Sequence, residues 1–180
     1  CPNIWDSGEQ KGIFSFYPEM INEAMDSVWE KVNHSLIWLA KVSPFSNPMQ
    51  LKEVLKVISG WLVDVVVTSN TSPNAYDEDD DGYSFITPGG GLAGYAGVGF
   101  RPIALGQVKQ WREALSPSID VIGVGGIDSG KAMAKFFRRN VVAVQVATAL
   151  LQKGHLDLHV LDRFLLEFSE LPEQEPETAA

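Results

Sequence analysis

Four short apolar runs recur along the chain, each bounded by residues typical of turns, and they constrain the fold more than any other feature. They occupy residues 36–42, 62–68, 119–124 and 141–146. Because each run is apolar nearly throughout, it is typical of a parallel strand that is covered on both faces. Stretches with helical spacing lie around them, at residues 19–33, 49–60, 102–115, 131–138 and 158–169. The alternation predicts an α/β fold with a parallel sheet.

One long connection, residues 69–100, interrupts this alternation. It contains an acidic run at 77–81 and a glycine-rich stretch that starts at 88. The connection leaves the carboxyl end of a predicted parallel strand, where α/β folds place their ligand sites. We therefore expect it to serve a ligand site, because structureless loops of this length are uncommon in compact domains.

The negative charge of the chain is concentrated in two places. The net charge is −9, and ten of the 23 acidic residues lie in the run 77–81 and among residues 167–177. The other 13 acidic residues nearly balance the 14 Lys and Arg residues. Without a basic stripe, nucleic acid is not an expected partner. We expect residues 1–170 to form one folded unit and residues 171–180 to form an acidic, disordered tail.

Membrane insertion and disulfide bonding are not expected. Asp64 interrupts the best apolar candidate well short of the roughly 18 residues that a span requires. Cys1 is the only cysteine, so an intrachain disulfide and a cysteine-based zinc site are both excluded. His155 and His159 lack a third ligand, and no metal site is predicted. These features favour a reducing, cytoplasmic setting.

Two neighbouring segments predict an anion site. Gly125 and Gly126 follow the third predicted strand and lead through Lys131 into a helix, so free backbone N–H groups are expected there. Ala147 and Thr148 follow the next strand, and the last two loops of a (β/α)₈ barrel often form a phosphate site together. Three alternatives stay open: a glycine turn needed only for chain geometry, a helix-capping role for Thr148, and a nucleotide-binding P-loop, which lacks its usual hydroxyl at Ala132.

Polar residues also follow the first two strands. Lys41 lies at the end of one, and Asn70 and Thr71 follow the other. In a barrel these side chains face the ligand mouth, where an ammonium group can stabilise a developing negative charge.

Six elements in order resemble those of a dihydroorotate dehydrogenase of the class 1 type, over roughly residues 1–150. They are Cys1-Pro2-Asn3, the strand that ends in Lys41, Asn70-Thr71, a glycine-rich loop leading to Arg101-Pro102, Gly125-Gly126-Ile127, and the segment from Gln145 to Leu150. A domain of dihydropyrimidine dehydrogenase shares this architecture and is an alternative. A non-catalytic flavin- or phosphate-binding relative is another, since the family usually has glycine at the position of Ala147 and a Gly-Ala turn near Arg139-Asn140.

The resemblance implies a (β/α)₈ barrel that binds FMN and oxidises dihydroorotate to orotate in pyrimidine biosynthesis. It implies that Cys1 is the base that removes a proton while hydride passes to flavin N5. By the same resemblance Asn3, Asn70 and Thr71 bind substrate, and Lys41 lies near the pyrimidine edge of the flavin. The phosphate loops contain Gly125, Gly126, Ala147 and Thr148. Gly94 is expected to bind the cofactor, whether the glycine-rich loop aligns through Gly94 and Gly97 or through Gly90, Gly91 and Gly94.

The resemblance also implies that the chain carries about the C-terminal half of the barrel, four of its eight strands. The opening Cys-Pro-Asn looks like a cut inside a longer chain. A half-barrel exposes two sheet edges, so we expect these 180 residues alone to be inactive. Fumarate is the expected electron acceptor for the class 1A type, whereas the class 1B type passes electrons to a separate iron–sulfur subunit and NAD, and both stay open. A homodimer is the family expectation.

Overall fold

A computed structural model describes residues 3–6, 9–33, 35–152 and 155–172. Its central sheet has four strands in the order β3-β4-β7-β8, and every neighbouring pair is parallel. The strands are β3 (Leu39–Val42), β4 (Val65–Thr68), β7 (Asp120–Val124) and β8 (Ala143–Gln145). The predicted parallel α/β fold is confirmed. Each strand is shorter than its apolar run, and one cause is visible at Leu62, whose φ of 52° makes a turn.

Within the described residues, five α-helices accompany the sheet: α1 (Pro18–Trp29), α2 (Pro48–Gly60), α3 (Arg101–Ala114), α4 (Gly130–Phe137) and α5 (His159–Ser169). Proline lies in the first turn of α1, α2 and α3, where a missing N–H costs no hydrogen bond. Asn47 caps α2 by accepting a hydrogen bond from the Met49 N–H at 2.9 Å. The five predicted helices are confirmed, although α1 ends four residues before its predicted end at 33.

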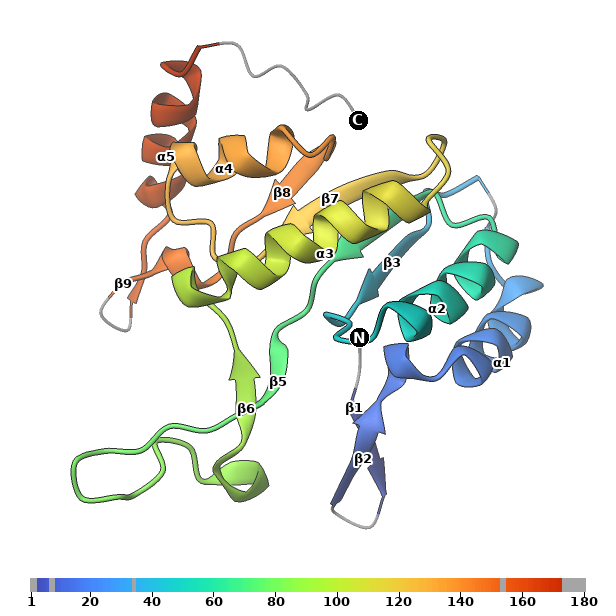
Figure 1. The fold of residues 1–180 in the computed structure, drawn as a ribbon, viewed down its shortest axis with the longest axis horizontal. Helices are drawn as coiled ribbons and strands as arrows, with labels where there is room; N and C mark the ends of the chain where they lie inside the picture. The colour runs from blue at the N-terminus through green and yellow to red at the C-terminus, as the bar shows by residue number, and fades with distance from the viewer. Residues whose placement is uncertain (1–2, 7–8, 34, 153–154, 173–180) are drawn as a thin grey trace.

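Helices α2, α3 and α4 cover one face of the sheet (Figure 1). The core between these layers contains Val66 and Val121 from the strands and Val108 and Trp111 from α3, all with no exposed surface. One close contact between the layers is at Gly123 of β7, where a side chain would collide with the ring of Phe136. The layer of helices therefore holds the strands in fixed positions relative to one another.

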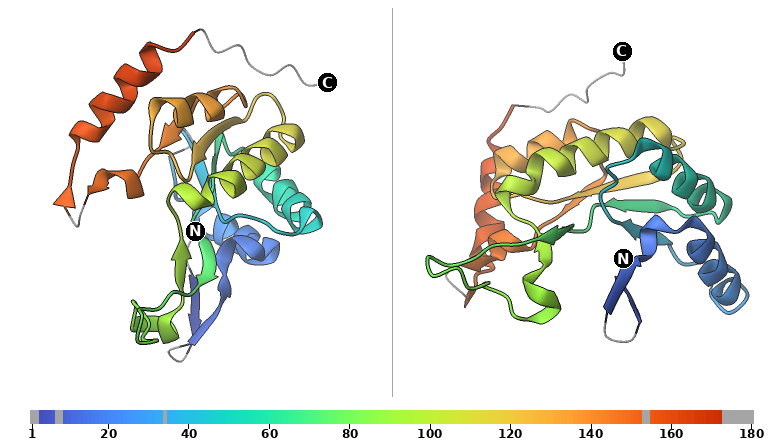
Figure 2. Two further views of the ribbon diagram at one scale, coloured as in Figure 1. Left: turned by 60° about the vertical axis from the view of Figure 1, so that its left-hand side comes forward. Right: turned by 60° about the horizontal axis from the view of Figure 1, so that its bottom comes forward.

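The sheet is curved, with a concave face opposite these helices. Lys41 on β3 donates a hydrogen bond from Nζ to Gln145 Oε1 on β8 at 3.1 Å, although β3 and β8 are the two outermost strands. Three inter-strand spacings in a flat sheet amount to about 14 Å, and side chains stand roughly perpendicular to a flat sheet. The hydrogen bond therefore requires the two outermost strands to curve towards each other. The curved sheet corresponds to four of the eight strands of a (β/α)₈ barrel. Figure 2 shows the sheet and its helices from two sides.

Three antiparallel hairpins were not anticipated from the sequence. They are β1 (Asn3–Asp6) with β2 (Glu9–Ile13), β5 (Ser72–Ala75) with β6 (Ala93–Tyr95), and β9 (Leu151–Gln152) with β10 (His155–Leu156). The first two project away from the sheet (Figure 1). The β5–β6 pair gives the long connection 69–100 an ordered base, so this connection is structured in part.

The described part of the chain also contains four short 3₁₀ helices: η1 (Phe14–Phe16), η2 (Pro88–Gly91), η3 (Val98–Phe100) and η4 (Thr148–Leu150). The predicted acidic tail lies outside the described residues from 173 onward. Among the described residues, no helix combines the length and the apolar character that a membrane crossing requires.

Candidate functional site

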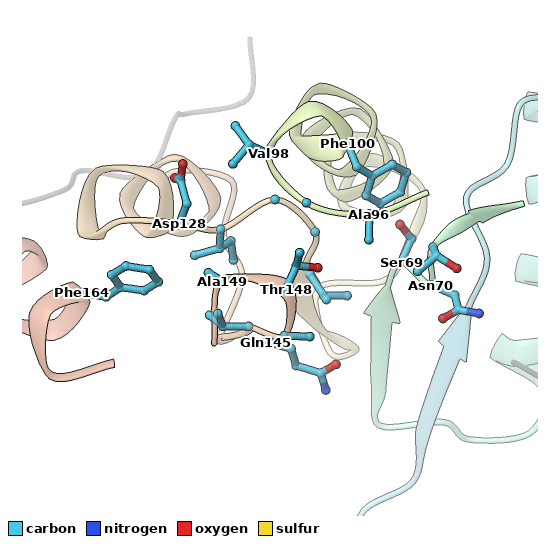
Figure 3. Close-up of a pocket in the computed structure, with 18 of the residues that line it drawn as sticks. Ser69, Asn70, Ala96, Val98, Phe100, Asp128, Gln145, Thr148, Ala149 and Phe164 are labelled. Atoms are coloured by element: carbon cyan, nitrogen blue, oxygen red, sulfur yellow. The ribbon is translucent and has the colours of Figure 1, made fainter. Parts of the chain in front are cut away.

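A cavity of about 410 Å³ lies at the carboxyl ends of the four parallel strands. This volume is within the range of small-molecule sites in proteins. Seven of the residues predicted from the sequence line it: Lys41, Asn70, Thr71, Gly125, Gly126, Ala147 and Thr148. Figure 3 shows Ser69 and Asn70 on one side, Asp128 and Phe164 on the other, and Thr148 between them. The topology thus brings together residues that are up to 107 positions apart, from 41 to 148.

We call the part of the cavity formed by Lys41, Ser69, Asn70, Thr71 and Gln145 the side-chain end. Its polar side chains lie at the carboxyl ends of strands β3, β4 and β8, either within the strand or directly after it. The Ser69 residue is 2% exposed, and its hydroxyl has no hydrogen-bond partner among the described residues. Buried polar groups are nearly always paired, so this hydroxyl points to a ligand.

Ser69 and Gln145 were missed as site residues by the sequence analysis. Gln145 ends β8 in the same way that Lys41 lies near the end of β3, and the two side chains are hydrogen-bonded. Their shared position at strand ends was the signal that could have identified Gln145. Ser69 gave no separate signal, because it is a small residue between a strand and Asn70.

We call the opposite part, formed by Gly97, Gly125, Gly126, Ala147 and Thr148, the glycine-rich end. Gly126 has a φ of +70°, and a side chain there would lie 2.7 Å from the Gly97 carbonyl oxygen. Gly125 has a φ of +125° and is equally crowded by α3. Only glycine fits both positions, so the turn is required for packing and also leaves its backbone open to the cavity.

Arg101 fixes this turn from the first position of α3. Its Nε donates to the Gly126 carbonyl at 2.7 Å, and its Nη2 donates to Asp128 Oδ1 at 2.6 Å. The ion pair is substantially shielded, since the Arg101 side chain is 18% exposed. The negative charge of Asp128, which lines the cavity, is thereby compensated.

The start of α4 is not available to an anion, which corrects one sequence prediction. The Gly130 N–H donates to Glu167 Oε2 on α5 at 2.8 Å. The Ala132 N–H donates to Ser129 Oγ at 3.2 Å. These N–H groups are occupied inside the protein, and neither Gly130 nor Lys131 lines the cavity. The same contacts argue against the P-loop alternative, in which this helix start would bind phosphate.

Gly94 does not line the cavity, contrary to the role predicted for it. It lies behind Thr71, and a side chain at Gly94 would collide with the Thr71 hydroxyl. Gly97 lines the cavity instead, with a φ of +79°, and a side chain added there would meet Thr148 Cγ2 at 3.5 Å. Thr148 is not the cap of η4, because that position is Ala147 and no side-chain cap bond is formed.

Two predicted residues cannot be placed in the cavity. Cys1 lies outside the described residues, and only the backbone of Asn3, in β1, is described. Within the described ranges, no group of three or more His, Cys, Asp or Glu residues could hold a metal ion.

The strand topology and the location of the cavity define the class of protein. It is an α/β chain of the (β/α)₈-barrel type with a cavity at the carboxyl ends of its strands, where barrels of this type place their ligand sites. Residues 1–167 match the family model described as dihydroorotate dehydrogenase. The chain therefore belongs to the dihydroorotate dehydrogenase family, and the expected resemblance is confirmed.

Similar curated proteins carry names of two types. The chain is 32% identical to "Dihydroorotate dehydrogenase (quinone), mitochondrial" of Schizosaccharomyces pombe, over 71% of this chain and 28% of that protein. It is 27% identical to "Probable dihydroorotate dehydrogenase A (fumarate)" of Enterococcus faecalis, over 95% of this chain and 52% of the relative. It is 26% identical to the fumarate-type enzyme of Lactococcus lactis subsp. cremoris, over 97% of this chain and 53% of the relative.

These two matches over nearly the whole chain are to fumarate-type enzymes, the class 1 type. The chain spans about half the length of these relatives.

Proposed function

We propose that the protein at its full length oxidises dihydroorotate to orotate with FMN as cofactor. The observation that supports this most is the cavity at the strand ends, which gathers seven of the ten predicted site residues in one place. The family match supports the same reaction, because the family is named after the oxidation of that substrate.

The two ends of the cavity suit the two parts of a flavin nucleotide. The glycine-rich end offers backbone groups at Gly126 and Thr148 for a phosphate, without side chains in the way. The side-chain end offers the Lys41 ammonium and the unpaired Ser69 hydroxyl for a polar ring edge. A flavin bound there supplies the chemistry that these residues lack, the acceptance of a hydride from the substrate.

The remaining polar residues at the side-chain end are assigned to substrate. Asn70 and Thr71 line the cavity, and we assign them, together with Asn3, to hydrogen bonds with dihydroorotate. Cys1 is assigned as the base that takes the substrate proton. A thiol has a reference pKa of about 8.5, close enough to neutral pH for this task.

The wider setting is part of the same proposal. Fumarate is proposed as the electron acceptor, since several relatives carry that term in their names. We further propose that the protein is a cytoplasmic homodimer. Residues 1–170 are proposed to form one folded unit, the C-terminal portion of the barrel. The 180 residues by themselves are proposed to be inactive, because β3 and β8 lack a neighbour on their outer sides in the described sheet.

Replacement of Cys1 tests the function. In the full-length protein, Cys1→Ala is expected to abolish reduction of bound flavin by dihydroorotate and to leave the flavin spectrum intact. Cys1→Ser is the matched control, because it retains a protonatable group of similar size and should support slow reduction. Unchanged reduction by Cys1→Ala contradicts the assignment of the base. A wild-type flavoprotein that dihydroorotate does not reduce favours the second candidate, a non-catalytic relative.

A further inference from the structure

Of the residues that the structure describes, three with ionisable side chains line the cavity: Lys41, Asp128 and Arg163. Asp128 is compensated by Arg101, whose Nη2 lies 2.6 Å from Asp128 Oδ1. The two remaining groups are both positive. The cavity therefore favours a ligand that carries negative charge, and the positions of the two cations indicate where that charge should be.

The two cations lie at different ends of the cavity. Lys41 is hydrogen-bonded to Gln145 at the side-chain end. Arg163 belongs to α5, and its Cζ lies 5.6 Å from the ring centroid of Phe164. Figure 3 shows Phe164 far from Ser69 and Asn70, on the same side as Asp128. Of the two cations, Arg163 is therefore the one on the side away from Ser69 and Asn70, beyond the glycine-rich end.

The positive charge of the Arg163 guanidinium is available to a ligand. Within the described ranges no carboxylate forms an ion pair with the Arg163 guanidinium. The adjacent Asp162 pairs with His159 instead, with 3.6 Å between Asp162 Oδ2 and His159 Nδ1. The other cations nearby are not available: Arg101 is held by Asp128 and Gly126, and Lys131 does not line the cavity.

A phosphate at the glycine-rich end needs such a charge. A phosphate monoester carries about −1.5 to −2 charges at neutral pH. The backbone N–H groups of the turn supply dipoles but no net charge, and Glu167 already occupies the start of α4. A guanidinium group offers several donors in a planar fork that matches phosphate oxygens.

We infer that Arg163 is the charge partner of the ligand's phosphate and selects phosphorylated over unphosphorylated flavin. This inference rests on the proposed function, because it takes the ligand of the cavity to be a flavin nucleotide. It assigns Arg163 a role in binding specificity, separate from the chemistry at the side-chain end.

The experiment compares two ligands that differ only in the phosphate. Dissociation constants for FMN and riboflavin are measured by quenching of flavin fluorescence with the full-length protein, its Arg163→Gln and Arg163→Lys variants, and Lys109→Gln. The last variant is the matched control, because it also removes one positive charge, from a lysine on α3 that pairs with Glu113 and does not line the cavity.

Arg163→Gln is expected to reduce the preference for FMN over riboflavin by about tenfold or more, as for the loss of a charged hydrogen bond. Riboflavin affinity should stay within about twofold, Arg163→Lys should retain part of the preference, and Lys109→Gln should retain all of it. An unchanged preference in Arg163→Gln overturns the inference and leaves the proposed function intact. Loss of riboflavin binding in the same variant also overturns it, because Arg163 is then structural. A wild-type protein that binds neither flavin overturns the proposed function itself.

Discussion

The two ends of the cavity are built by different means. At the glycine-rich end the backbone forms the site, and Gly125 and Gly126 are packed against α3 so closely that neither tolerates a side chain. At the side-chain end the strands only provide positions, and Lys41, Ser69 and Asn70 supply the polar atoms. Changes at the glycine-rich end should therefore act through the stability of the fold, whereas changes at the side-chain end should act through chemistry with the fold intact.

The largest effect is expected at Gly126. Gly126→Ala forces a side chain into a φ of +70° and within 2.7 Å of the Gly97 carbonyl oxygen and Arg101 Cβ. Backbone strain and overpacking together should lower the free energy of unfolding by about 2–5 kcal/mol. Thermal denaturation of the full-length protein measures the loss, and flavin content should fall with it. A variant that keeps its stability and loses only flavin would contradict the expectation that this end acts through the stability of the fold.

The next largest effect is expected for Asn70, at the side-chain end of the cavity. Asn70→Ala should raise the KM for dihydroorotate by roughly 10–100-fold, as for the loss of a hydrogen bond to a charged ligand. Flavin content and melting temperature should stay at wild-type values, because the residue lines the cavity and is not part of the core. Steady-state kinetics and a melting curve on one preparation check both halves of this prediction. A large drop in melting temperature would show that this end also acts through the fold.

A smaller effect is expected where the two outermost strands meet. Gln145→Leu removes the 3.1 Å hydrogen bond to Lys41 and should weaken flavin binding by about 0.5–1.5 kcal/mol. The double variant with Lys41→Met should be no weaker than Lys41→Met alone, because the two side chains act as one unit. Flavin titrations of the four proteins in this cycle measure the coupling. Strictly additive losses would mean that Gln145 does not position Lys41.

The smallest expected effect is a stabilisation of the fold. Gly106 lies within α3, and a side chain added there meets nothing within 4 Å. Gly106→Ala should therefore raise the free energy of unfolding by about 0.5–1 kcal/mol through helix propensity. It is the matched control for Gly126→Ala, since both change glycine to alanine. If it destabilises the protein as much as Gly126→Ala does, crowding is not the reason glycine is needed at 126.

The sequence predicted the sheet and most of the cavity because both depend on local patterns. Apolar runs such as 65–68 identify buried strands, and polar residues directly after them must meet at one edge of a parallel sheet. Contacts between distant elements could not be predicted in this way. The hydrogen bond from Gly130 to Glu167, 37 positions apart, removes the anion site expected at α4. The β5–β6 hairpin places Gly97 in the cavity and Gly94 behind Thr71, although both follow the same run of glycines.

The proposed reaction can be followed by anaerobic titration of the full-length protein with dihydroorotate, monitored by visible absorption. We expect the purified protein to show a flavin spectrum, with one FMN per chain, that bleaches after addition of about one equivalent of substrate. A protein that is isolated without flavin and does not acquire a flavin spectrum when FMN is added would contradict the assignment of the cavity.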